Sequence, residues 1–306
     1  MNIHTLDLEF LGIEKTIAVF VVEGSEGLAL VECGPASTLP YLQKILEENG
    51  WQLSDFQHIF LTHIHFDHAG AAWAFAEHGA KIYVHPKGLP NLAQPEKLYQ
   101  SARMIYGDDM DRLWGEMRPI PPNQLYAPEH GEIIEVIGLQ FRAWHTPGHA
   151  VHHIAWEVNS SISQPVEGMV FTGDVAGVRM SGGPVMPPCP PPDIQVEDWL
   201  NSIALLRALP SKRFFLTHFG EIKDTHEHLD ALAKRLLQWA EWMRPRVEAN
   251  IPAEVIIPDF QAFVRAELLA QGVSKEDLPR YEAANPAFMS VAGLTRYWKK
   301  KLERSQ

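Results

Sequence analysis

Cysteine is scarce in this chain of 306 residues, which has only Cys33 and Cys189. Two cysteines cannot build the disulfide framework that holds small secreted domains together, so a reducing compartment is expected. The sequence also lacks any apolar run close to the ~20 residues that a membrane helix requires, and its first residues lack the basic flank and apolar stretch of a signal peptide. We therefore expect a cytoplasmic protein with no membrane partner.

Positively charged residues are also few. Lysine and arginine number 26 against 38 aspartate and glutamate residues, which gives a net charge of −12. An acidic surface repels a phosphate backbone, so nucleic acid is not expected as a partner. The one basic run, between Arg296 and Arg304, is better explained as the solvated end of a helix.

The apolar share of 46% is enough to form an ordinary globular core. Residues 16–23 and 28–33 predict a β-hairpin, residues 39–49 a helix, and residues 225–247 a long amphipathic helix. Strands alternating with helices are typical of a layered α/β fold. Residues 88–122 interrupt this pattern as a helical insertion. We expect one catalytic domain over residues 1–250 and a helical extension over residues 251–306.

Four predicted strands end in the same way, with histidine or aspartate a few residues after the apolar run. Ligand sites of α/β proteins gather at strand ends, where loops converge on a rigid sheet. Seven side chains share this placement: His63, His65, Asp67, His68, His149, Asp174 and His218. A lone histidine beside a strand is more often a satisfied polar residue than a ligand. Seven such donors are too many for one zinc ion, which takes about four, and they suit two metal ions.

The motifs THIHFDHAG, TPGH, FTGD and LTHFG, in this order, resemble the signature of the metallo-β-lactamase fold superfamily. The resemblance covers about residues 1–240 and implies a four-layer αββα sandwich. It also implies two divalent metal ions, with zinc as the first choice and iron or manganese as alternatives. In this pattern His63, His65 and His149 hold the first metal. The second is held by Asp67, His68 and His218, and Asp174 bridges the two.

Such a site predicts a hydrolase that acts on a small ester, thioester or lactone through a metal-bridging hydroxide. Asp67 and Asp174 are the expected catalytic residues, with Asp67 also able to accept a proton. Glyoxalase II and the lactonases of this fold share the ligand set, although no basic glutathione-binding tail is evident here. Two alternatives stay open: a persulfide dioxygenase that uses one iron, and a phosphodiesterase on the same fold.

Two segments are expected to shape a substrate pocket. Tyr106 and Trp114 lie in the insertion, where relatives of this fold place a lid. Met180 and Met186 lie in the loop over residues 177–192, which directly follows the bridging aspartate. Six prolines stiffen this loop. Packing in the core is an equally good explanation for the aromatic residues.

The other histidines are given lesser roles. His152 and His153 are expected to be buried supports beside the ligands. His226 and His228 lie on the long helix and are expected to be solvated. The helical extension either caps the pocket or pairs two subunits in a homodimer, and the sequence does not separate these options.

Overall fold

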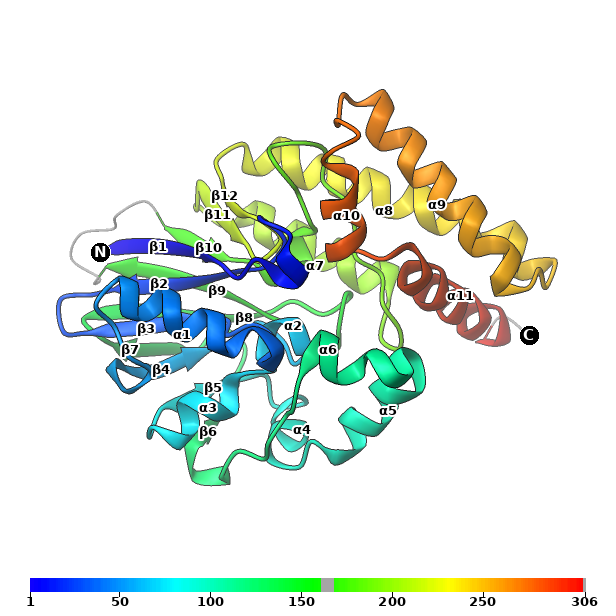
Figure 1. The fold of residues 1–306 in the computed structure, drawn as a ribbon. Coiled ribbons are helices and arrows are strands. Elements are labelled where there is room, and N and C mark those ends of the chain that lie inside the picture. Colours follow the sequence, from blue (N-terminus) through cyan, green and yellow to red (C-terminus); the bar gives the residue numbers. More distant parts are fainter. Residues whose placement is uncertain (161–167, 305–306) are drawn as a thin grey trace.

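The computed structural model describes residues 1–160 and 168–304. The first half of the chain forms a six-stranded sheet whose strands lie side by side in chain order (Figure 1). The first two pairings are antiparallel and the next three are parallel. Its strands are β1 (Asn2–Asp7), β2 (Ala18–Glu23), β3 (Leu28–Val31), β4 (Phe56–Phe60), β5 (Lys81–Tyr83) and β6 (Leu125–Tyr126).

The second half forms another six-stranded sheet, again in chain order. Only β10 and β11 pair in parallel, and the other neighbours are antiparallel. Its strands are β7 (Ile133–Val136), β8 (Leu139–His145), β9 (Ile154–Ser160), β10 (Met169–Phe171), β11 (Arg213–Leu216) and β12 (Gly220–Ile222).

The two sheets pack face to face because successive side chains along their strands point to opposite faces and both faces are apolar. Along β2, Phe20 and Val22 point into the core between the sheets, while Val19 and Val21 point to the outer side. Aromatic rings fill the inner layer, and Phe60 of the first sheet stacks on Phe141 of the second with ring centroids 4.0 Å apart.

Helices cover both outer faces, so the predicted αββα sandwich is confirmed (Figure 1). The first sheet is covered by α1 (Leu39–Glu48) and α3 (Ala72–Glu77), with the short α2 (Phe66–Ala69) at its edge. The second sheet is covered by α7 (Val196–Ala208) and α8 (Thr225–Glu248).

The helical insertion is also present. It consists of α4 (Leu89–Ala93), α5 (Glu96–Tyr106) and α6 (Met110–Trp114), which lie between β5 and β6 along the chain. Their buried side chains join the core on the outer side of the first sheet.

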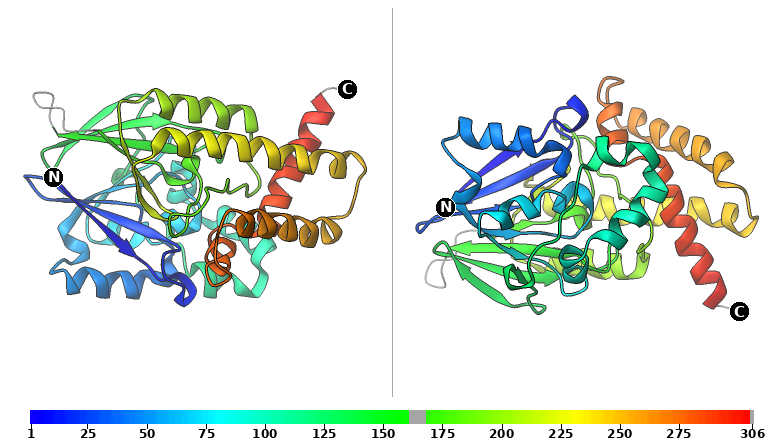
Figure 2. Two further views of the ribbon diagram at one scale, coloured as in Figure 1. Left: turned by 90° about the horizontal axis from the view of Figure 1, so that it is seen from above. Right: turned by 60° about the horizontal axis from the view of Figure 1, so that its bottom comes forward.

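The C-terminal extension forms α9 (Ala253–Ala270), α10 (Leu278–Ala284) and α11 (Ala287–Arg304). These helices share one hydrophobic core with α7, α8 and the loop over residues 177–192. In two further views α9 runs beside α8 (Figure 2). A domain boundary near residue 250 therefore remains a prediction from the sequence. Among the helices of the described ranges, none is long and apolar enough to cross a membrane.

Candidate metal centre

Loops at one edge of the sandwich carry all seven predicted donors. His63 and His65 follow β4, and Asp67 and His68 lie in α2. The second sheet supplies the rest: His149 between β8 and β9, Asp174 after β10, and His218 after β11. The structure brings these side chains into three overlapping groups, in each of which the donor atoms lie within 4.8 Å of one another. Strand ends therefore converge as the sequence predicts.

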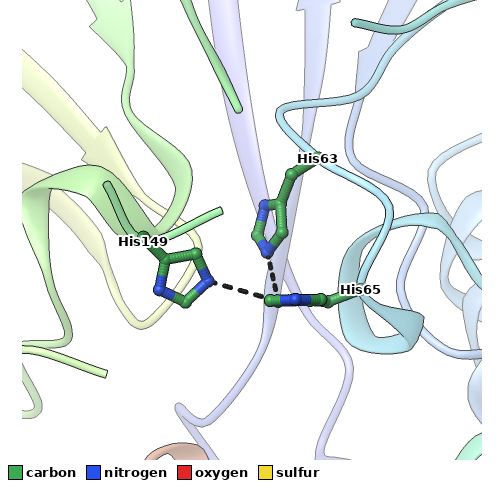
Figure 3. Close-up of side chains that lie close together, drawn as sticks. All are labelled: His63, His65 and His149. Carbon is green, nitrogen blue, oxygen red and sulfur yellow. Dashed lines mark hydrogen bonds between the residues drawn. The ribbon is translucent and has the colours of Figure 1, made fainter. Parts of the chain in front are cut away.

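Three histidines form the first group. The Nε2 of His63 lies 2.8 Å from the Nδ1 of His65, which lies 3.2 Å from the Nε2 of His149. All three rings point toward a common centre (Figure 3). Two nitrogens bound to one tetrahedral zinc ion at ~2.0–2.1 Å lie ~3.4 Å apart. The two observed separations, 2.8 and 3.2 Å, are shorter than this value, and all three donor atoms lie within 4.8 Å of one another, so the three rings are grouped closely enough to share one small ion.

Asp174 connects this group to the second one. Its Oδ2 lies 3.4 Å from the Nε2 of His149, whereas its Oδ1 lies 3.4 Å from the Nε2 of His68 and 3.5 Å from the Nε2 of His218. The Oδ2 of Asp67 is 3.5 Å from the Nε2 of His218 and completes the second group. One carboxylate thus presents one oxygen to each group.

Asp174 takes this position because of the glycine before it. Gly173 begins a 3-10 helix, η6 (Gly173–Ala176), with a φ of +47°, a conformation that favours glycine. A Cβ at this position would lie 2.4 Å from the Oγ1 of Thr62. The glycine therefore lets the aspartate loop approach the histidine loop closely.

Protein acceptors fix which nitrogen of each ring faces the centre. The Nδ1 of His149 donates to the carbonyl of Pro188 at 2.8 Å, and the Nδ1 of His218 donates to the carbonyl of Thr16 at 2.6 Å. The Nε2 of His218 and of His68 and the Oδ1 of Asp174 are then buried without a hydrogen-bond partner. Such orphaned atoms are costly unless something else binds them. A metal ion fits them, because a neutral imidazole with a donating Nδ1 leaves the Nε2 lone pair free.

Glu32 orients His68, a role that was not predicted from the sequence. Its side chain is 0% exposed and accepts hydrogen bonds from the Nδ1 of His68 at 2.8 Å, from the backbone N–H and hydroxyl of Thr62, and from the hydroxyl of Thr217 at 3.2 Å. The residue directly follows β3, whereas the sequence predicts a strand over residues 28–33 that includes it. The carboxylate ties together the ends of β3, β4 and β11.

The charges of the second group stabilise one another. Burial alone would raise the pKa of Asp67, but the positive charges of His68 and His218 lower it to about 2. Burial opposes protonation of His68, yet the carboxylates of Asp67, Asp174 and Glu32 raise its pKa well above the usual value. The cavity therefore holds a concentration of negative charge that attracts a cation.

The two aromatic residues predicted for the pocket lie beside the second group. Burial raises the pKa of Tyr106, and the negative charge of Asp67 raises it further. The indole of Trp114 stacks on Phe66, the neighbour of Asp67, with ring centroids 6.1 Å apart. The hydroxyl of Tyr106 contacts the Sδ of Met289 at 3.8 Å, which brings the insertion and the extension together.

The two predicted pocket methionines are placed differently. Met180 and Met186 are both buried in the core that the loop shares with α7–α11. Met186 also lines a cavity of about 540 Å³ between α9 and α10, together with Arg265 and Leu268. Their contact with a substrate stays a prediction.

His152 and His153 are buried as expected, and the hydroxyl of Thr146 is hydrogen-bonded to the Nδ1 of His153 at 2.8 Å. His226 is exposed, but the prediction for His228 is wrong. Its side chain is buried, and its Nε2 donates to the carbonyl of Ala176 at 2.7 Å. The signal was available, because His228 falls on the stripe of buried residues along α8.

Comparison with known proteins bears on the family and the fold of the chain. The family model of the metallo-beta-lactamase superfamily matches residues 14–218. A metallo-beta-lactamase fold-containing protein, ST1585 of Sulfurisphaera tokodaii, is 26% identical over 82% of this chain and 95% of its own length. A hydroxyacylglutathione hydrolase of Pseudomonas aeruginosa is 26% identical over 90% of each chain. The crystal structure of the family protein TTHA1429 from Thermus thermophilus covers 98% of this chain and 93% of its own, with a TM-score of 0.65 at 21% identity.

Proposed function

Since the chain belongs to the metallo-beta-lactamase superfamily, we propose that it is a hydrolase with two metal ions that acts on a small ester, thioester or lactone. Asp174 carries the proposal, because its two carboxylate oxygens face two different donor groups. An arrangement of this kind suits a pair of ions more closely than a single one.

Each donor has a role in this proposal. His63, His65 and His149 would hold the first ion, Asp67, His68 and His218 would hold the second, and Asp174 would serve both. When bound, two such ions acidify a water and polarise the substrate's carbonyl oxygen. The protein's part is to fix the donors, and it does so through buried acceptors for their second nitrogens.

Asp67 is the proposed proton acceptor. Its side chain is 20% exposed, whereas that of Asp174 is only 6% exposed. One of its oxygens faces His218, so the carboxylate lies at the edge of the second donor group with part of its surface open to solvent. Such a group can orient a nucleophile and take up a proton that is released during turnover.

Three observations support a small acyl compound as the substrate. The aromatic rings of Phe66, Tyr106 and Trp114 form an apolar wall beside Asp67. The net charge of −12 disfavours nucleic acid. The Pseudomonas relatives are named as hydrolases of a hydroxyacylglutathione, so an S-acyl thiol is the first compound to test.

Metal content per chain, measured by elemental mass spectrometry on protein purified without added metal or chelator, tests the proposal. We expect about two zinc or manganese ions per chain. The protein should then hydrolyse members of a panel of S-acyl thiols, lactones and phosphodiesters. Cleavage of phosphodiesters alone would move the assignment to a phosphodiesterase. About one iron per chain would favour the persulfide dioxygenase, and no metal after reconstitution would overturn the metal site itself.

Asp174→Asn is the matched variant for this measurement. Its amide keeps the size of the side chain but offers only one good acceptor oxygen to the two groups. We expect it to retain less than the full metal content and to lose activity on every substrate that the parent cleaves.

A further inference from the structure

One of the first-group histidines is oriented by a segment that has no regular structure of its own. The Nδ1 of His149 donates to the carbonyl of Pro188 at 2.8 Å. Residues 187–189 belong to neither a helix nor a strand. Something else must therefore fix this carbonyl if the ring is to keep its direction.

The C-terminal extension supplies that support from both sides of Pro188. The Nδ2 of Asn285 donates to the carbonyl of Pro187 at 3.2 Å, and the backbone N–H of Cys189 donates to the Oγ of Ser290 at 3.3 Å. The hydroxyl of Ser290 in turn donates to the Oδ1 of Asn285 at 3.0 Å. These hydrogen bonds join the end of α10 and the start of α11 to the segment.

The helix α11 also lies against the segment with almost no space between them. A Cβ on Gly293 would lie 2.0 Å from the carbonyl oxygen of Cys189. Cys189 is fully buried and Ser290 is 1% exposed, so water does not compete for these bonds. Only glycine allows the helix to approach this far.

The second donor group is supported elsewhere. Its rings are held by Glu32, on His68, and by the carbonyl of Thr16, on His218. Both acceptors lie in the first sheet or its loops, far along the chain from the extension. The acceptor that orients His149 and the acceptors that orient His68 and His218 therefore lie in different parts of the protein.

We propose that Asn285, Ser290 and Gly293 form a clamp that positions His149 for metal binding, so that the C-terminal extension is a working part of the three-histidine group. This inference rests on the proposed metal site. By holding the carbonyl of Pro188, the clamp keeps the proton of His149 on Nδ1 and directs Nε2 toward His63 and His65. The three clamp residues are positioning residues and do not touch the substrate.

The test compares Ser290→Ala and Gly293→Ala with Tyr297→Phe, a control on the same helix. The control removes a hydroxyl that donates to Glu197 and accepts from Lys301, and neither bond involves residues 187–189. Zinc affinity is measured for each equivalent by competition with a chromophoric chelator. We expect Ser290→Ala to weaken one of two zinc equivalents about 10-fold, and Gly293→Ala to weaken it more, with the other equivalent and the control unchanged.

A second measurement does not need metal. In the zinc-free protein, nitrogen-15 NMR of the imidazole groups should show a protected Nδ1–H for His149 in the parent and in Tyr297→Phe. The same signal should exchange faster in Ser290→Ala, which also covers the case that Gly293→Ala does not fold.

Two outcomes would overturn the clamp: unchanged affinity with an unchanged His149 signal, or equal weakening of both zinc equivalents, as a general loss of stability would give. A parent protein that binds no zinc overturns the proposed function instead. That result appears before any variant is made.

Discussion

Replacing Glu32 with glutamine tests how far the metal affinity of the site and the stability of the protein depend on a residue that is not itself a ligand. The change keeps the shape of the side chain, but an NH₂ group takes the place of one oxygen. Four hydrogen bonds from His68, Thr62 and Thr217 end on this buried carboxylate. Even if the NH₂ turns toward the backbone N–H of Thr62, that donor is left without a partner.

The cost follows from those bonds. One unpaired buried donor costs ~1–3 kcal/mol, and the bonds that remain lose the added strength of a charged acceptor. We therefore expect Glu32→Gln to lower the free energy of unfolding of the zinc-free protein by ~2–4 kcal/mol. Zinc affinity should fall ~10–100-fold, because the oxygen that accepts the Nδ1 proton of His68 loses its negative charge and orients the ring less firmly.

Urea denaturation of the zinc-free protein and chelator competition together measure both effects. Glu23→Gln on β2 is the control, since the side chain of Glu23 is 45% exposed, accepts a hydrogen bond from the Asn2 side chain and lies 3.6 Å from the Nε2 of His4. It should change neither quantity. If Glu32→Gln matched the parent in both stability and zinc affinity, the role of Glu32 as an orienting acceptor would be refuted.

Three further predictions concern the site and its surroundings. Asp67→Asn should lower kcat by at least ~10²-fold in a steady-state assay, because the amide cannot accept a proton, and a variant with full metal content and full rate would rule out this role. Removal of metal by a chelator should lower the free energy of unfolding by ~4 kcal/mol, compared with protein in free zinc at 1,000 times its Kd. Identical denaturation curves would show that no ion binds the folded state selectively. Burial lowers the pKa of His228 to about 4. As the pH falls, the ring is therefore protonated in the unfolded chain before it is protonated in the folded protein. The stability that the neutral ring contributes is complete above about pH 6.5 and declines toward pH 4. His228→Gln should reduce the loss of stability over this window by ~3 kcal/mol in urea titrations, and equal pH slopes for parent and variant would contradict the assignment.

Local patterns predicted a layered α/β fold and the seven candidate donors, whereas the four-layer arrangement followed from the resemblance to the family. Apolar runs of strand length end at His63, His149 and His218 within a few residues, and strands of one sheet bring their ends to one edge. The helical insertion and α8 were also predicted, since helical spacing and flanking glycine are visible in the sequence itself.

The sequence did not predict contacts between distant segments. Glu32 falls inside the predicted strand over residues 28–33, and its hydrogen bond from Thr217 joins residues 185 positions apart. The bond between Asn285 and Pro187 spans 98 positions, so the role of the extension was left open. His228 was misread because burial of a polar residue on an amphipathic helix depends on what packs against it.

The division of the chain into two consecutive sheets has a consequence for its chain entropy. Residues 1–126 carry four of the seven donors and residues 133–222 carry three, so neither half contains a complete group. An ion shared by His65 and His149, which are 84 positions apart, would act as a cross-link between the halves. A covalent link that closes a loop of this length restricts the unfolded chain by ~4–5 kcal/mol in the chain-entropy model. Both cysteines are free and buried. In this protein a bound metal ion would therefore cross-link the two halves as a disulfide does in other proteins, and a chelator could remove this cross-link.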